Sequence, residues 1–295
     1  MRVAANGIEI ECELHGPPNG APLLLIMGLG MQLTAWPEEL LKTLGDKDFR
    51  PVTFDNRDIG LSTKLDAAGM PNLLVAGLRQ MIGLPLRSAY LLSDMAKDAL
   101  GLLDALNIPT CHVAGVSMGG MIAQHLAVMA PARVQSLALI MTTSGARSLP
   151  GPTMRARRAL LSRPAASNVE ARITHAMGIW RVIGSPAYPA TDEELHAKLG
   201  RSIRRSYCPP GMARQLVAVA ASADHTALLA RVTAPTLVLH GRDDPLVPVE
   251  CGVDLAKKIA GAQLEVIDGM GHDMPAELIP RLAASIVANA ARAAL

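Results

Sequence analysis

The sequence predicts an α/β fold with a mostly parallel, doubly wound sheet and an inserted block of helices. Three observations predict this fold. Short, continuously apolar segments recur along the chain, as is typical of parallel strands covered on both faces. Segments with a helical pattern lie between them, and such alternation is typical of a doubly wound sheet. Residues 145–232 contain helical patterns but no clear strand, which indicates an insertion.

The strands are predicted from the start of the chain onward. Residues 8–14 alternate apolar and polar side chains, so we expect a half-exposed strand there. The Asn6-Gly7 pair before it suits a tight hairpin turn from a first strand at 2–5. Continuously apolar strands are then expected at 23–27, 51–54, 111–116, 137–141, 236–240 and 264–267.

Helices are predicted between these strands. Residues 93–106 carry acidic side chains early and an apolar stripe, and Asn107 and Pro109 mark the end. A second helix, 118–129, ends before Pro131. Two more helices, at 255–260 and 275–290, are expected after later strands.

The inserted stretch divides the chain into two predicted units. It lies between the strands at 137–141 and 236–240. We therefore interpret 145–232 as a helical cap, and 1–144 together with 233–295 as the core domain. A cap restricts access to a site beneath it, which favours small or medium substrates over a polymer surface.

Composition excludes several classes of protein. The chain has 295 residues, half of them hydrophobic, which is enough for one large α/β domain. The net charge is +2, and the only basic clusters, 155–158 and 201–205, are interpreted as solvated helix faces. We therefore expect no nucleic-acid partner. The four cysteines are scattered without metal-ligand spacing and are expected to be free thiols: Cys12, Cys111, Cys208 and Cys251.

The sequence also bears on location. The start of the chain has no continuous apolar segment of the kind that a secretory signal needs. The apolar run 22–29 is far too short to span a bilayer. A soluble, cytoplasmic protein without a membrane partner is expected, and the pattern does not predict an oligomeric state.

A candidate nucleophile lies in Gly115-Val116-Ser117-Met118-Gly119, which matches G-x-S-x-G. Chance alone can supply this pattern, but here it follows an apolar strand and opens a helix. That is the setting in which a serine sits on a strained turn with its Oγ exposed. The helix N-terminus supplies partial positive charge for a developing oxyanion. The alternative is a buried serine at a glycine-rich turn.

A serine needs a base, and His272 is the candidate. It sits in Gly269-Met270-Gly271-His272, a loop directly after the last strand. Loops at the carboxyl ends of parallel strands are where open α/β sheets place their sites. Six other histidines fall in expected strands (His112, His240), a helix (His125) or the cap (His175, His196, His225), and we interpret them as packed or solvated.

The acid that orients the histidine is expected after the strand at 236–240, where Asp243 and Asp244 follow each other. We choose Asp244 because it fits a Gly-x-x-Asp-x-x-x-Pro spacing, and interpret Asp243 as a surface or turn-capping acid. The loop after 137–141 offers no acid. The resulting order is Ser117, Asp244, His272.

With this order the chain resembles the α/β-hydrolase superfamily over nearly its whole length. Three more stretches agree: 22–29, the D-x-R-x-x-G-x-S turn at 55–62, and 269–272. Within the superfamily the chain is similar to small capped esterases such as aclacinomycin methylesterase, which share a Met-Gly pair at the oxyanion loop. The resemblance implies that the N–H groups of Leu29 and Met118 form the oxyanion hole. It also implies that Gly60 and Ser62 are structural residues that steady the oxyanion loop.

The expected activity is hydrolysis of small to medium apolar carboxylic esters through an acyl-serine, with no metal or cofactor. Other reactions on the same triad stay open: lactone, thioester or C–C bond hydrolysis and cofactor-free perhydrolysis. Haloalkane dehalogenases and epoxide hydrolases are disfavoured, because they use an aspartate where this chain has Ser117. A non-catalytic ligand receptor on this fold is the alternative from a different class.

Methionines cluster beside the motifs, and flexible thioethers suit an adaptable apolar pocket. The alternative is that methionine fills core space in a chain that has few aromatic residues. The side chains expected to line a substrate pocket are Met27, Met31, Trp36, Trp180 and Met270.

Overall fold

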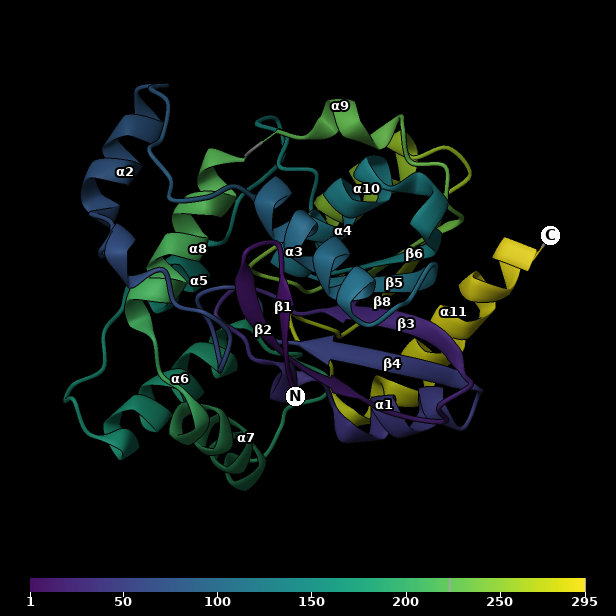
Figure 1. Cartoon of the computed structure of the whole chain (residues 1–295). Helices are drawn as coiled ribbons and strands as arrows, with labels where there is room; N and C mark the ends of the chain where they lie inside the picture. The colour runs from purple at the N-terminus through teal and green to yellow at the C-terminus, as the bar shows by residue number, and fades with distance from the viewer. Residues whose placement is uncertain (223, 295) are drawn as a thin grey trace.

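A computed structural model describes residues 1–222 and 224–294 and shows an eight-stranded sheet in the order β1-β2-β4-β3-β5-β6-β7-β8 (Figure 1). The β1–β2 and β2–β4 pairs are antiparallel, and all other pairs are parallel. The predicted α/β fold with a mostly parallel sheet is therefore confirmed. The strands are β1 Arg2–Ala5, β2 Ile8–Leu14, β3 Ala21–Ile26, β4 Phe49–Phe54, β5 Cys111–Val116, β6 Val134–Ile140, β7 Thr236–Gly241 and β8 Gln263–Ile267.

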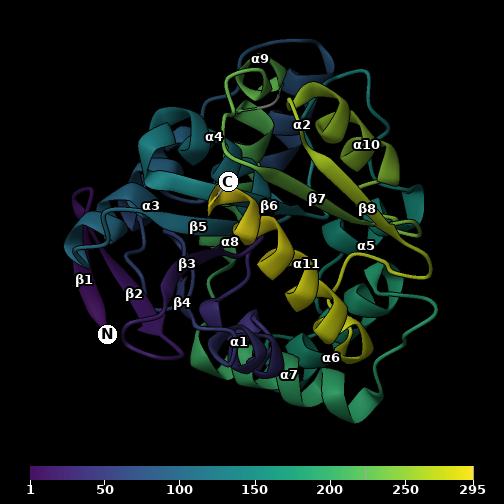
Figure 2. The ribbon, with the colours of Figure 1, turned by 90° about the vertical axis from the view of Figure 1, so that its right-hand side faces the viewer.

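Helices cover both faces of the sheet (Figure 2). One face carries α3 (Leu92–Ala105), α4 (Met118–Met129) and α10 (Val249–Lys258). The other face carries α1 (Glu38–Gly45) and α11 (Ile279–Ala291). Successive residues of β3 alternate between the two resulting cores, because neighbouring side chains of a strand point to opposite faces.

Two helix predictions need correction. The helix expected at 255–260 begins six residues earlier, at Val249, and ends at Lys258. The helix begins directly after Pro248, and its buried residues are Cys251, Gly252 and Leu255. This apolar pattern is too sparse to predict where the helix begins. The helix expected from 275 opens with a short 3₁₀ turn, Ala276–Leu278, before α11 begins. Two further helices, α1 and α2 (Leu73–Met81), have no counterpart among the helices predicted from the sequence.

Helices also fill the interval between β6 and β7, as the predicted insertion requires. They are α5 Met154–Leu161, α6 Val169–Ile183, α7 Asp192–Arg205, α8 Pro209–Ala221 and α9 Thr226–Leu229. In Figure 1 the first four gather with α2 on one side of the sheet domain. The fifth, α9, instead packs against α4 and α10 of the core. The cap boundaries at 145 and 232 stay a prediction. None of the helices in the described ranges is both long and apolar enough to cross a bilayer.

Candidate active site

Ser117 lies on the sharp turn between β5 and α4. Its φ of 54° and ψ of −121° are strained for a residue with a side chain, and such strain is typical of functional sites. Two glycines allow the turn: a Cβ on Gly115 would lie 2.3 Å from Gly119 O, and a Cβ on Gly119 would lie 2.0 Å from Ile26 O. Both contacts are with backbone that cannot yield, so larger residues are excluded at either position.

His272 and Asp244 complete a hydrogen-bonded line with this serine. His272 Nε2 lies 3.0 Å from Ser117 Oγ, and His272 Nδ1 lies 2.7 Å from Asp244 Oδ2. Because a carboxylate only accepts, the ring proton belongs on Nδ1, and Nε2 is left to accept the serine proton. The structure therefore brings the three predicted catalytic residues together, in the geometry that base-assisted attack by a serine requires.

Backbone amides hold the Asp244 carboxylate in place. Its Oδ1 accepts hydrogen bonds from Leu246 N–H and Val247 N–H, both at 2.8 Å. Asp243 points elsewhere: its Oδ2 accepts from Gly269 N–H at 2.8 Å and so steadies the loop that carries His272. The two adjacent acids thus have different partners.

The cap also holds the histidine loop. His272 N–H donates to Ile183 O at 2.7 Å, at the end of α6. Gly271 N–H donates to Ser185 Oγ at 2.9 Å, and Ser185 Oγ in turn donates to Asp273. Burial raises the pKa of Asp273. The position of the His272 ring therefore depends on the cap as well as on the sheet.

The expected oxyanion loop passes beside the nucleophile. A Cβ on Gly28 would lie 3.2 Å from Ser117 Cβ, which fixes how closely the two segments approach. Within the described ranges, neither Leu29 N–H nor Met118 N–H has a hydrogen-bond acceptor. Both amides are thus available to an oxyanion, and their role in the oxyanion hole stays a prediction.

The turn after β4 braces this loop, as the resemblance implied. Asn56 Nδ2 donates to Met27 O at 3.0 Å, and Leu33 N–H donates to Asp55 Oδ1 at 2.8 Å. Ser62 Oγ donates to Asp55 O at 2.6 Å. Gly60 has a φ of 59°, and a Cβ there would lie 1.9 Å from the Asp55 carboxylate. Its lack of a side chain is therefore required.

The side chains expected to line a pocket fall into two groups. Met27, Trp36 and Met270 are at most 3% exposed and belong to the hydrophobic core beneath α1 and α11. Met31 is partly buried against the same core, and Trp180 lies under Lys198, whose Nζ is 4.5 Å from the ring centroid. Burial of the first three agrees with the packing alternative, and the pocket role of all five stays a prediction.

Among the cap residues that form hydrogen bonds with the core loops, Arg205, Arg214 and Gln215 have charged or amide side chains that were not predicted to do so. Arg205 bonds Asp55 Oδ2 at 2.7 Å, and Gln215 accepts from Gly30 N–H. Arg214 forms a two-pronged pair with Asp58, at 2.6 and 2.8 Å. The only earlier sign was the cluster 201–205, which we interpreted as a solvated face. That interpretation is wrong for Arg205, since only 17% of its side chain is exposed.

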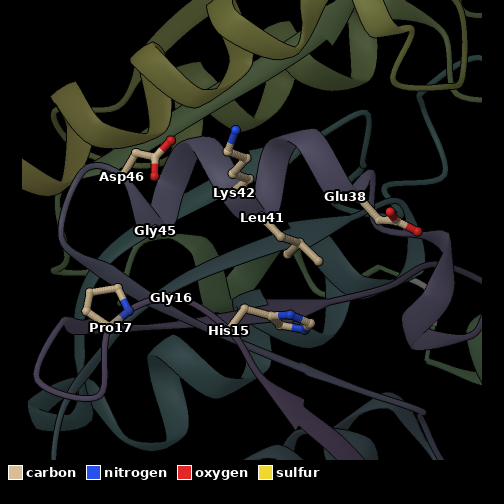
Figure 3. A pocket seen from close by; sticks show the side chains of 8 residues that line it. All are labelled: His15, Gly16, Pro17, Glu38, Leu41, Lys42, Gly45 and Asp46. Atoms are coloured by element: carbon tan, nitrogen blue, oxygen red, sulfur yellow. The ribbon is translucent and has the colours of Figure 1, made fainter.

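A separate hollow of about 510 Å³ lies between α1 and the segment His15–Pro17 (Figure 3). Glu38, Lys42 and Asp46 contribute charged groups to its rim. The segment precedes β3, so this hollow borders the amino end of the strand, whereas Ser117 follows the carboxyl end of β5. It is not part of the candidate active site. Within the ranges described, no group of three or more His, Cys, Asp or Glu side chains could hold a metal ion.

Known proteins resemble this chain over most of its length. The family model of the alpha/beta hydrolase fold matches residues 21–277. The chain is 28% identical to rhodomycin D methylesterase DauP of Streptomyces sp. (strain C5), over 97% of this chain and 96% of DauP. It is 32% identical to a RutD protein of Variovorax paradoxus (strain S110), named provisionally as a carbamate hydrolase, over 90% of each chain.

Solved structures share the fold. The enol-lactonase from Burkholderia xenovorans LB400 superposes with a TM-score of 0.75 at 23% identity, covering 98% of this chain and 99% of that one. A thermophilic esterase from Thermogutta terrifontis gives 0.71 at 25% identity, covering 99% of each chain. The chain therefore belongs to the α/β-hydrolase family. Its family and its relatives define it as a hydrolase, and the resemblance to small capped esterases is confirmed.

Proposed function

We propose that this hydrolase cleaves small to medium apolar carboxylic esters, with Ser117 as nucleophile, His272 as general base and acid, and Asp244 as the orienting carboxylate. The observation that carries the proposal is the continuous line of hydrogen bonds from Asp244 through His272 to Ser117. Full-length similarity to two rhodomycin D methylesterases supports an ester as the scissile group.

The reaction follows from these positions. His272 Nε2 removes the Ser117 proton as Oγ attacks the ester carbonyl, and the oxyanion is held by Leu29 N–H and Met118 N–H. His272 then protonates the departing alcohol, which leaves an acyl-serine. His272 next takes a proton from water, the hydroxide attacks the acyl carbon, and the acid is released as Ser117 recovers its proton.

Substitution of the nucleophile tests the proposal. Ser117→Ala should abolish hydrolysis of p-nitrophenyl butyrate, because no other group in the hydrogen-bonded set of Asp244, His272 and Ser117 can attack the carbonyl. Turnover by a folded Ser117→Ala variant would refute the assignment.

A substrate panel tests the ester bond itself. Esters graded by acyl length and alcohol bulk should be cleaved in preference to lactones, thioesters and vinylogous diketones. Preference for one of those controls would replace the ester by another reaction on the same serine. Tight binding of a panel member without turnover would indicate a receptor.

A further inference from the structure

A cap side chain reaches the loop that carries the proposed oxyanion donor. Gln215, on α8, is completely buried. Its Oε1 accepts a hydrogen bond from Gly30 N–H at 2.9 Å, and its Nε2 donates to Arg57 O at 2.9 Å. One glutamine of the cap thus joins the residue after Leu29 to the turn after β4.

The backbone at this point leaves little freedom. Gly30 has a φ of +70°, a conformation that favours glycine, and a Cβ there would lie 3.2 Å from Met212 of α8. The bond to Gln215 fixes the planar peptide group between Leu29 and Gly30. On the other side, Gly28 abuts Ser117. Leu29 therefore lies between Gly28, which packs against Ser117, and Gly30, whose N–H is bonded to Gln215.

The far end of the loop has its own anchor on the cap. Gln32 Nε2 donates to Ser202 O at 2.7 Å and to Ser206 O at 2.9 Å, at the end of α7. Arg205 donates to Gln32 Oε1 at 2.7 Å. These bonds are three residues beyond Leu29, whereas Gln215 acts on the adjoining peptide group.

We propose that Gln215 is a positioning residue for the reaction: by holding Gly30 N–H, it sets the direction of the Leu29 N–H toward the oxyanion. This inference rests on the proposed function. An oxyanion donor acts on charge that develops in the transition state, so its displacement lowers kcat more than it raises KM. The oxyanion hole is then complete only when α8 packs against the loop that carries Leu29 and Gly30.

The test compares two equally buried glutamines. Gln215→Met keeps the volume and removes both hydrogen bonds. It should lower kcat for p-nitrophenyl butyrate about 10- to 100-fold, since small displacements of catalytic groups cost this much. The matched control is Gln124→Met in α4, where a buried glutamine donates only to Thr143 O. It should lose thermal stability without a comparable loss of kcat.

An inhibitor separates positioning from general packing. An alkyl trifluoromethyl ketone adds to Ser117 and places its oxyanion where the Leu29 and Met118 amides point. Its affinity for Gln215→Met should fall by the same factor as kcat/KM, because both depend on the transition-state contact, while KM stays within about threefold.

Three outcomes would overturn the inference. The first is a folded Gln215→Met enzyme with kcat and inhibitor affinity within about threefold of the unmodified protein. The second is an equal kcat loss in Gln124→Met. The third outcome concerns a second variant, which is used if Gln215→Met does not fold. Gln215→Asn is one methylene too short to span both partners, so it should also lose kcat. A kcat equal to that of the unmodified protein in Gln215→Asn would contradict the role. If Ser117→Ala is inactive while Gln215→Met is fully active, only this inference fails; turnover by Ser117→Ala defeats the proposed function itself.

Discussion

His272 Nδ1 lies 2.7 Å from Asp244 Oδ2, while the neighbouring Asp243 bonds only the backbone of the histidine loop. Asp244→Asn would present an amide N–H or a weaker acceptor to the ring, and would disfavour the tautomer that accepts the Ser117 proton. We expect kcat to fall about 10³- to 10⁴-fold. Steady-state kinetics on p-nitrophenyl butyrate measure this loss.

Asp243→Asn is the control for that substitution. The amide oxygen of an asparagine can still accept from Gly269 N–H, so we expect less than about a tenfold loss of kcat. A larger loss in Asp243→Asn than in Asp244→Asn would reverse the assignment of the acid.

Arg214 and Asp58 form a buried ion pair between α8 and the turn after β4, and Tyr90 Oη donates to the same carboxylate at 2.8 Å. Burial alone would raise the pKa of Asp58, but the hydrogen bonds from Arg214, Leu65 and Tyr90 outweigh it and hold that pKa below its ordinary value. Arg214→Met should lower the free energy of unfolding by about 3–5 kcal/mol, because an uncompensated charge stays buried.

Urea denaturation measures this loss, and Arg201→Met is the control. Arg201 pairs with Glu38 at the surface, where 59% of its side chain is exposed. Such pairs contribute about 0–1 kcal/mol. Equal effects of the two substitutions would show that the buried pair does not hold the cap in the way described.

His125 on α4 faces His225, with ring centroids 5.2 Å apart. Burial, together with the charge of His225, lowers the pKa of His125 from 6.5 to about 4. The unfolded chain therefore binds a proton between pH 6.5 and 4 that the folded chain does not, so acidification through this window lowers stability. Above pH 6.5 the residue is neutral in both states and contributes nothing.

His125→Gln should remove that part of the pH dependence. We expect the loss of unfolding free energy between pH 7.5 and 4.5 to be smaller in the variant by about 1–2 kcal/mol. Urea denaturation at the two pH values measures the difference. Identical pH dependence in both proteins would show that His125 titrates normally in the folded state.

Much of the fold, and the meeting of Ser117, Asp244 and His272 at one site, could be predicted, because the signals are local. Ser117, Asp244 and His272 each follow an apolar strand, and parallel strands bring their carboxyl ends to one edge of the sheet. The start of α10 could not be predicted in the same way, since its buried side includes a glycine and a cysteine, and its first residues carry no continuous apolar pattern.

The contacts between cap and core could not be predicted either. Gln215 and Gly30 are 185 residues apart, and no motif joins them. Arg205 lies in a basic cluster that resembles a solvated helix face, and only the fold turns it toward Asp55. Which polar groups pair over such distances depends on how the cap helices pack on the core, and local composition does not determine that packing.

The most direct test of the account is to map the site of covalent modification by a fluorophosphonate. The probe phosphonylates an activated serine, so one equivalent should add to the unmodified protein, and peptide mass spectrometry should place it on Ser117. His272→Ala should slow the labelling strongly, because the serine then lacks its base. Labelling of a different residue, or no labelling of an active preparation, would contradict the central claim that Ser117 is the nucleophile.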